Sequence, residues 1–354
     1  MRTNKIMKKT HNDRQDHGST RSAQMPSSAD RLDSRLNRVL DRFACPACLH
    51  GPGAERSSLV EESGALQCSS CRQRFPIRHG VPDLRPDAGK ETSSSLEAVE
   101  FYERVYTEQI YGRDDQSEHR ASLEDALKAL DSDSLVVELG TGKGALQGVH
   151  PGYVGTDISL EGLLAHIRTP SFVSDAMALP LSSQSVDYLF TVATLEHVNR
   201  PERALAEISR VIRPGGIAYL APAWNCRTWA SEGLHVRPYR DLTVPQRLRK
   251  ATIPIRNSVV WRGAFAIPKR TLRRLWCKLR RRPADFRYRR LNPNYEVFWA
   301  SDSDATAQMD PHEAALYFES HGWEIVSPAD VLGRIFHRHQ PLIVRRPESA
   351  RVPS

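Results

Sequence analysis

Apolar and polar positions alternate regularly only from about residue 134 onward. There, short runs rich in Val, Leu, Ile and Tyr are separated by turns and amphipathic stretches, a pattern that predicts buried strands alternating with helices. Strands with near-continuous apolar runs are typical of parallel sheets that are buried on both faces. The pattern therefore predicts an α/β domain with helices on both faces of a mostly parallel sheet. The predicted strands are SLVVELG, YVGTDIS, SFVSDA, VDYLFTV and GGIAYLAPA.

The alternation stops after residue 222 and resumes roughly 85 residues later. A helix from about residue 311 to 320 and the runs GWEIVS and QPLIVRR then add two strands, which predicts a Rossmann-like sheet of seven strands. The interruption leaves the sheet after its fifth strand. It is therefore interpreted as an insertion that caps the ligand-binding edge of the sheet, and not as a second Rossmann domain.

The N-terminal part of the chain has a different composition. Residues 1–28 are polar and poor in aromatic residues, which predicts a disordered tail. Apolar residues recur at helical spacing between Leu32 and Phe43 and predict a short amphipathic helix. Two CxxC pairs follow, separated by 19 residues. Two such pairs supply four thiolates for a closed, tetrahedral zinc site, and the predicted ligands are Cys45, Cys48, Cys68 and Cys71.

Zinc at this position is expected to be structural. A module of about 40 residues has too small a core to fold unaided, so bound zinc would contribute directly to its stability. His50 and His79 could replace a ligand, although four cysteines make them unnecessary. The alternative is a set of unligated buried cysteines. The other two of the six cysteines stand alone, a pattern that suits metal ligation better than a disulfide framework.

These changes of pattern place the expected boundaries. In chain order, we expect a disordered tail (1–28), a zinc-ribbon-like module with a leading helix (29–86), a linker with helices (87–130), a Rossmann-like core (131–225), a basic cap or insertion (226–308), a C-terminal helix with the last two strands (309–346) and a short tail (347–354).

Composition limits the class of protein. The chain has 354 residues, of which 40% are hydrophobic and 26% are charged, as in ordinary globular proteins. No apolar run is long enough to span a membrane, and the basic N-terminus lacks the apolar stretch of a secretory signal. We therefore expect a cytoplasmic protein, with a peripheral position at the inner face of the membrane as the alternative.

A glycine-rich turn follows the first strand of the sheet, in the segment ELGTGKG at residues 138–144. Glycines permit a tight turn and a close approach of the backbone to a ligand. Asp157 ends the next strand, where an acid can accept hydrogen bonds from ribose hydroxyls. Asp175 ends the third strand, where a carboxylate can meet an adenine amino group. Ala145 breaks the GxGxxG pattern that a dinucleotide dehydrogenase would carry.

At these positions the chain resembles the class I S-adenosylmethionine-dependent methyltransferases of the type 11 family. Four blocks occur in the family's order between residues 135 and 222, namely VVELGTGKG, VGTDIS, SDAMALPLSSQSVDYLF and LEHVNRPERALAEISRVIRPGGIAYL. The resemblance implies an enzyme that binds S-adenosylmethionine and transfers its methyl group. The residues that it assigns to cofactor binding are Glu138, Gly140, Thr141, Gly142, Gly144, Asp157, Ile158, Asp175 and Ala176.

One feature departs from that family. Only 12 residues separate Gly144 from Asp157, and Gly148, Pro151 and Gly152 interrupt them. The helix that the glycine-rich turn should open is therefore expected to be curtailed.

The methyl acceptor is expected beside the end of the fourth strand, where Glu196 and His197 lie. A hydroxyl acceptor would benefit from a general base, and His197 is the best-placed candidate, with Glu196 as its neighbour. The alternative is that the two residues only shape the cofactor pocket. His235, Tyr239 and Tyr295 in the insertion are further candidate contacts of the acceptor.

The insertion carries the positive charge of the chain. Residues 237–290 contain 18 Lys and Arg against two acids, so the net charge of +8 comes entirely from this stretch. Residues 268–282 predict a helix with Leu272, Leu275, Trp276 and Leu279 on one face, flanked by Arg and Lys. Such a helix is typical of segments that lie on anionic membrane surfaces. A cap helix packed on the domain with a solvated basic rim is the alternative, and RNA binding is a third interpretation.

The sequence therefore supports three hypotheses of function. The first is methyl transfer to a small-molecule, glycan or lipid-linked acceptor at oxygen, since residues 299–328 resemble the tail of methyltransferases from sugar and polysaccharide pathways. The second is an RNA methyltransferase that grips phosphates with its basic stretch. The third is a non-catalytic scaffold that docks a partner through the cysteine module, which resembles the zinc-ribbon-like (Trm112-like) modules found before bacterial methyltransferase domains.

Overall fold

The computed structural model describes residues 31–49, 57–86, 94–107, 116–280, 282–297, 299, 302–337 and 339–348. The tail expected at 1–28 and most of that expected at 347–354 lie outside the described residues.

A seven-stranded sheet forms the centre of the molecule, in the order β12-β13-β9-β8-β5-β6-β7. Its strands β5 to β9 pair in parallel, and β13 is antiparallel to both of its neighbours. The predicted seven-stranded, mostly parallel sheet is thereby confirmed. The strands are β5 (Val136–Leu139), β6 (Tyr153–Asp157), β7 (Ser171–Val173), β8 (Val186–Val192), β9 (Ile212–Ala221), β12 (Glu324–Ser327) and β13 (Leu342–Arg345).

Helices cover both faces of this sheet. Alternate residues of a strand point to opposite faces, and Val136 packs with α3 (Ser117–Leu127) while Val137 shares a core with α5 (Pro201–Val211) and α9 (Pro311–Ser320). The helix α4 (Leu160–His166) packs on β6 and β7, and α2 (Leu96–Thr107) packs against α4. This arrangement leaves the carboxyl ends of the strands as the edge at which a ligand can bind.

The connection between β5 and β6 contains no helix, since its residues form turns. The helix that the glycine-rich loop was expected to open is therefore absent and not merely curtailed. Gly148 adopts a positive φ of 74°, and a Cβ on Gly152 would come within 2.0 Å of the Ser134 carbonyl oxygen. This close approach keeps the connection short.

The cysteine module is built on the edge of the large sheet. Its own sheet runs in the order β1-β2-β3-β4. Leu84, just past β4, donates to the carbonyl of Val173 in β7 at 2.9 Å, and the rings of Phe43 and Phe172 lie 5.0 Å apart. The helix predicted between Leu32 and Phe43 is shorter than expected. The elements are α1 (Ser34–Asn37), the 3-10 helix η2 (Leu40–Arg42), β1 (Leu59–Glu62), β2 (Ala65–Cys68), β3 (Arg74–Arg78) and β4 (Val81–Pro82).

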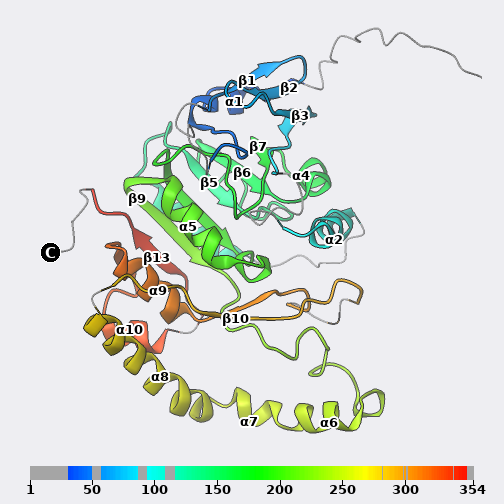
Figure 1. Ribbon diagram of the computed structural model, residues 1–354, viewed down its shortest axis with the longest axis vertical. Helices are drawn as coiled ribbons and strands as arrows, with labels where there is room; N and C mark the ends of the chain where they lie inside the picture. The colour runs from blue at the N-terminus through cyan, green and yellow to red at the C-terminus, as the bar shows by residue number, and fades with distance from the viewer. Residues whose placement is uncertain are drawn as a thin grey trace, which may run out of the picture.

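The insertion forms a line of helices along the side of the molecule opposite the cysteine module (Figure 1). A two-stranded antiparallel pair, β10 and β11, connects it back to the core. Within the described residues, no helix is long and apolar enough to cross a membrane. The elements are the 3-10 helix η5 (Tyr239–Asp241), α6 (Val244–Ala251), α7 (Ile253–Asn257), α8 (Val259–Arg280), β10 (Tyr288–Arg290) and β11 (Ala307–Met309). The helix α10 (Val331–Phe336), between β12 and β13, packs against α8.

The orientation of α8 corrects one expectation. One interpretation was a cap helix packed on the domain with a solvated basic rim, but Arg270, Arg273 and Arg274 of this helix are buried. The apolar residues Leu272 and Leu279 are instead 66% and 74% exposed. Helical periodicity identifies the two faces of a helix, but it does not determine which one turns inward when buried acids are available as partners.

Candidate active site

The glycine-rich loop turns tightly at the carboxyl end of β5. Gly140, Gly142 and Gly144 all adopt positive φ angles, of 81°, 51° and 73°, which L side chains rarely adopt. A Cβ on Gly140 would lie 2.2 Å from the Oγ1 atom of Thr194. The loop and the segment after β8 therefore touch, and together they bring the cofactor candidates next to the acceptor candidates. Thr141 is buried within the same turn.

Asp157 anchors this loop from the end of β6. Its Oδ2 atom accepts from the backbone N–H of Gly142 at 2.9 Å, and its Oδ1 atom accepts from the N–H of Ser159 at 3.1 Å. Burial raises the pKa of this carboxyl, while the backbone donors of Gly142 and Ser159 act in the opposite direction. The carboxylate is thus held rigidly, and its remaining lone pairs can accept from ribose hydroxyls.

Glu138 is also buried, one strand away. It accepts a hydrogen bond from the hydroxyl of Tyr153, and burial raises its pKa to about 8. Because this pKa lies above 7, the carboxyl holds its proton at neutral pH. A protonated carboxyl can donate a hydrogen bond as well as accept one.

Asp175 and its neighbours form the third part of the cofactor edge. Asp175 accepts from the N–H of Met177 at 2.9 Å and from the N–H of Ser94, just before α2, at 2.5 Å. Ala176, next in the chain, packs against the main core. Ile158 packs against Phe101 and its neighbours on α2. The structure thus gathers the predicted cofactor residues along one edge, from β5 to β7.

Tyr295, one of the candidate acceptor contacts, lies beside α2. Its ring lies 4.9 Å from the ring of Phe101, in the cluster that covers Ile158. A residue from the insertion therefore helps α2 to cover the cofactor edge.

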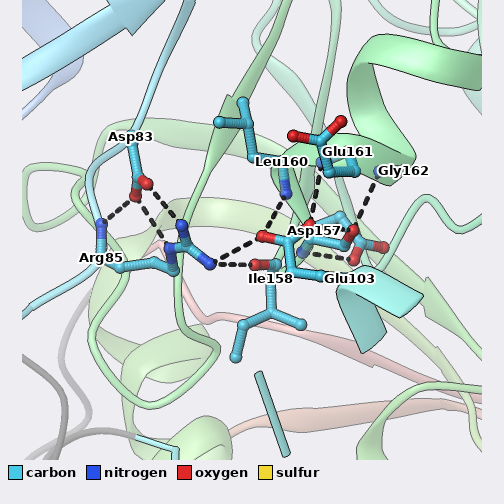
Figure 2. Close-up of polar contacts among 9 residues, drawn as sticks. Asp83, Arg85, Glu103, Asp157, Ile158, Leu160, Glu161 and Gly162 are labelled. Carbon is cyan, nitrogen blue, oxygen red and sulfur yellow. Dashed lines mark hydrogen bonds and ion pairs between the residues drawn. The ribbon is translucent and has the colours of Figure 1, made fainter. Parts of the chain in front are cut away.

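An ion-pair network connects the cysteine module to the same edge (Figure 2). Arg85, at the end of the module, pairs with Asp83 and with Glu103 of α2, and it donates to the carbonyl of Ile158 at 3.0 Å. Glu103 in turn caps α4, accepting from the hydroxyl of Ser159 at 2.7 Å and from the first two backbone N–H groups of the helix. Sequence reasoning missed these residues because nothing in the chain links positions 85, 103 and 158.

His197 lies in a buried cluster of acids on the 3-10 helix η4 (Leu195–His197). Its Nδ1 atom is 3.0 Å from Asp304 Oδ2, which also accepts from the hydroxyl of Tyr102 at 2.8 Å. Glu196 is fully buried, and its Oε1 atom lies 3.8 Å from His197 Nε2. Burial alone would lower the pKa of His197, but the charges of Asp304 and Glu196 raise it to about 10. The imidazole therefore carries its second proton at neutral pH.

Asp304 is the functional candidate that sequence reasoning missed. It lies 107 positions after His197, in the segment WASDSD, and only the fold brings the two side chains together. A buried carboxylate beside an imidazole is a frequent feature of sites that tune protonation. The paired acids in that segment were the available signal.

A cavity of about 550 Å³ opens at the carboxyl ends of β8 and β9. Its lining includes Val192 and Ala193 after β8, Ala223 after β9, and the polar side chains of Arg227 and His235. His235, a candidate acceptor contact, thus lines a cavity at the end of β8, but Glu196 and His197 are not among its lining residues. Tyr239 is about half exposed on η5, where its ring lies 5.1 Å from the Lys250 ammonium.

The four predicted zinc ligands converge in the cysteine module. The sulfur atoms of Cys45, Cys48, Cys68 and Cys71 all lie within 4.8 Å of one another, with Cys45–Cys71 at 3.7 Å and Cys48–Cys68 at 3.9 Å. Tetrahedral zinc–sulfur bonds of about 2.3 Å put neighbouring sulfurs roughly 3.8 Å apart. Two backbone N–H groups point at the Cys68 sulfur. The donor set and its spacing fit a closed zinc site.

Comparison with known proteins agrees with both parts of this architecture. Residues 137–220 match the methyltransferase domain family, and residues 37–80 match the Trm112p-like protein family. A tRNA (carboxymethyluridine(34)-5-O)-methyltransferase, ALKBH8 of Macaca fascicularis, is 34% identical over 164 residues, which cover 42% of this chain and 24% of that protein. The corresponding enzyme of Arabidopsis thaliana is 30% identical over 159 residues, covering 40% of this chain and 37% of that protein. The chain thus spans less than two fifths of the length of either relative.

Among solved structures, a SAM-dependent methyltransferase from Thermotoga maritima is 16% identical, with a TM-score of 0.37, over 71% of this chain and 99% of that one. The fold and the family match identify residues 137–220 as part of an S-adenosylmethionine-dependent methyltransferase domain. In particular, the chain joins a methyltransferase domain to a Trm112p-like module.

Proposed function

We propose that the chain transfers the methyl group of S-adenosylmethionine to an oxygen atom of an RNA, with tRNA as the first candidate. The observation that carries this proposal is the similarity to two tRNA carboxymethyluridine methyltransferases over segments about twice as long as the methyltransferase family match. The basic insertion supports it, since Lys and Arg side chains neutralise RNA phosphates. Sequence alone favoured a small-molecule, glycan or lipid-linked acceptor, and the relatives favour RNA.

In this proposal the cofactor lies along the edge from β5 to β7. S-adenosylmethionine supplies a methyl group on a positively charged sulfur. Asp157 accepts from the ribose hydroxyls, Asp175 from the adenine amino group, and Ile158 packs on the adenine ring. The glycine-rich loop, from Gly140 to Gly144, lets the backbone approach the methionine end. The positive φ angles of the three glycines and the hydrogen bond from Gly142 to Asp157 support these roles.

We further propose that His197 is not the general base. Its pKa of about 10 keeps the imidazole protonated at neutral pH, so it has no lone pair with which to take a proton. A carboxymethyl acceptor needs no base, because its carboxyl group is already ionised. One carboxylate oxygen then bonds to the methyl carbon as the carbon–sulfur bond breaks in line, and no proton moves. His197 and Glu196 shape and position the pocket.

The cysteine module is proposed to hold one structural zinc ion. Cys45, Cys48, Cys68 and Cys71 supply the four ligands, and the site has no open position for chemistry. Its role in catalysis is indirect, because Arg85 at its end contacts the cofactor edge.

A second candidate acceptor is a small glycan or lipid-linked sugar. A second cavity, of about 750 Å³, lies beside α8. It shares Asn225, Arg227 and Trp229 with the 550 Å³ cavity at the ends of β8 and β9. The larger cavity is lined by aromatic residues, including Trp261 and Phe265, and by several arginines. An amphiphile with an anionic group would fit such a lining.

The test is methyl transfer from labelled S-adenosylmethionine to three pools: total tRNA, soluble nucleotide sugars and extracted polyprenyl-linked sugars. We expect label in tRNA that ribonuclease releases, and no label with an Asp157→Ala variant. Label confined to a sugar or lipid pool would favour the second candidate. A protein that binds the cofactor and labels no pool would contradict both. A rate that stays flat between pH 6 and 7, below the pKa of Glu138, is expected for an ionised acceptor, whereas a histidine base would give a rate that falls on the acid side.

A further inference from the structure

The helix α8 presents its apolar face to solvent. Six large apolar side chains recur at helical spacing on this face, and each is between 40% and 74% exposed. The opposite face contains the buried side chains of Arg270, Arg273, Arg274 and Cys277. A helix on the surface of a soluble protein has the reverse arrangement, with its apolar stripe facing the core. We call the exposed set the α8 stripe, and it consists of Trp261, Phe265, Leu272, Leu275, Trp276 and Leu279.

Buried ion pairs fix this orientation. Arg270 makes two hydrogen bonds to Asp310, the N-cap of α9, at 2.7 and 3.2 Å. About one turn further along α8, Arg273 pairs with Glu313 at 3.2 Å and Arg274 pairs with Glu319 at 2.5 Å. Rotation of α8 to bury the stripe would carry these arginines away from α9. The carboxylates of α9 would then be covered by apolar side chains and lack partners, which is strongly unfavourable. The outward stripe is therefore a stable feature of the fold.

The neighbouring helices extend the apolar surface. Figure 1 shows α6 and α7 continuing the line of α8, and they expose Val244, Leu248 and Ile255. On the other side, α10 packs against α8 and exposes Leu332 and Phe336. Exposed apolar surface of this extent marks an interaction site.

The charges around the stripe indicate the chemistry of its partner. No Asp or Glu occurs between Asp241 and Asp285 in the sequence. The same segment carries exposed cations beside the stripe, among them Lys269 and Lys278. The partner must therefore offer both apolar contact and negative charge. A nucleic acid offers the charge but no apolar surface large enough to cover a row of Leu side chains, whereas an anionic bilayer offers both.

We propose that the α8 stripe docks on an anionic membrane surface, with α8 lying in the plane of the interface. No described helix can cross a membrane, which agrees with a helix that lies on the surface. Trp261 and Phe265 of the stripe also line the 750 Å³ cavity, so docking would place this cavity at the lipid surface. This inference goes beyond the proposed function, since it concerns where the enzyme works and not what it methylates.

The experiment is co-sedimentation of the full chain with vesicles of phosphatidylcholine alone and of phosphatidylcholine with phosphatidylglycerol. We expect binding to the anionic vesicles that weakens at 0.5 M salt. A Leu272→Ser/Leu279→Ser variant should bind more than about tenfold more weakly, since it loses two apolar side chains that enter the bilayer when the chain docks. The matched control is Val60→Ser/Leu96→Ser, which removes two similarly exposed residues far from the stripe and should bind as the native chain does.

Three results would overturn the proposal. The first is a native chain that sediments with neither vesicle, and the second is a stripe variant that binds as well as the control. The third is a dimer in sedimentation equilibrium that the stripe variant loses, which would make the occupant a second copy of the chain. Cofactor affinity is measured in parallel for each variant. Unchanged affinity shows that the variant is folded, and it separates a failure of docking from a failure of the proposed methyl transfer.

Discussion

At the scale of single residues, the least expected finding is the pair of buried acids that contacts His197. The residue was a candidate base by position, yet Asp304 and Glu196 surround it with negative charge and favour its charged form. A charged imidazole can orient a substrate oxygen and compensate negative charge, but it cannot accept a proton. The acidic partners thus decide the role of this histidine.

This arrangement predicts how stability depends on pH. The pKa of His197 is raised from 6.5 to about 10 in the folded chain. Its ion pair with Asp304 therefore stabilises the fold fully below about pH 6.5, and this contribution is lost as the pH rises through 10. An Asp304→Asn variant should be destabilised more at pH 6.5 than at pH 10. Denaturant unfolding of both proteins at the two pH values checks this, and an equal difference at both would contradict the ion pair.

At the scale of elements, the link from the cysteine module to the cofactor edge has the clearest consequence. Arg85 joins Asp83, Glu103 and the carbonyl of Ile158 in one cluster, and Glu103 caps the N-terminus of α4. The start of α4 follows directly on Asp157 and Ile158. The position of the cofactor edge thus depends on a residue of the module.

An Arg85→Ala variant should consequently bind S-adenosylmethionine about tenfold more weakly, since a charged hydrogen bond that positions the edge is lost. Arg85→Lys should restore little, because a single ammonium cannot bridge three oxygen partners in the geometry of a guanidinium. Calorimetric titration measures both. The matched control is Arg35→Ala, which removes an exposed arginine of the same module. Equal affinities for all four proteins would show that the network has no part in cofactor binding.

The elements also show what sequence reasoning can reach. The strands of the large sheet and the helix α9 follow directly from apolar runs and turn residues, and the four cysteines follow from their spacing. The pairing of His197 with Asp304, the cap from Glu103 and the burial of Arg273 and Arg274 against α9 were not predictable in this way. Each depends on a contact between distant segments, and local periodicity carries no information about such partners.

At the scale of the whole molecule, the cysteine module and the methyltransferase domain share one core. Leu36, Phe43 and Leu66 of the module belong to the same buried cluster as Phe172 and Leu179 of the domain. Hydrogen bonds from Ala44 and Leu84 continue the contact along the sheet edge. The two parts should therefore unfold together and not as independent units.

Removal of metal tests this coupling. We expect about one zinc per chain in the purified protein and a single thermal transition. A strong chelator should lower the melting temperature of that whole transition, since metal binding contributes to folding of the module and the module shares the core. Added zinc should restore it. Absence of bound metal, or a melting temperature that the chelator leaves unchanged, would contradict a structural zinc site.

The most direct test of the central claim is calorimetric titration of the purified chain with S-adenosylmethionine, beside an Asp157→Ala variant and an Asp125→Ala control on the exposed surface of α3. The account predicts micromolar binding by the native chain and the control, binding of S-adenosylhomocysteine as well, and a loss of more than about tenfold in the Asp157 variant, because a buried carboxylate that accepts charged hydrogen bonds is removed. Failure of the folded, zinc-loaded native chain to bind would contradict the assignment as a methyltransferase and leave a non-catalytic scaffold as the better interpretation.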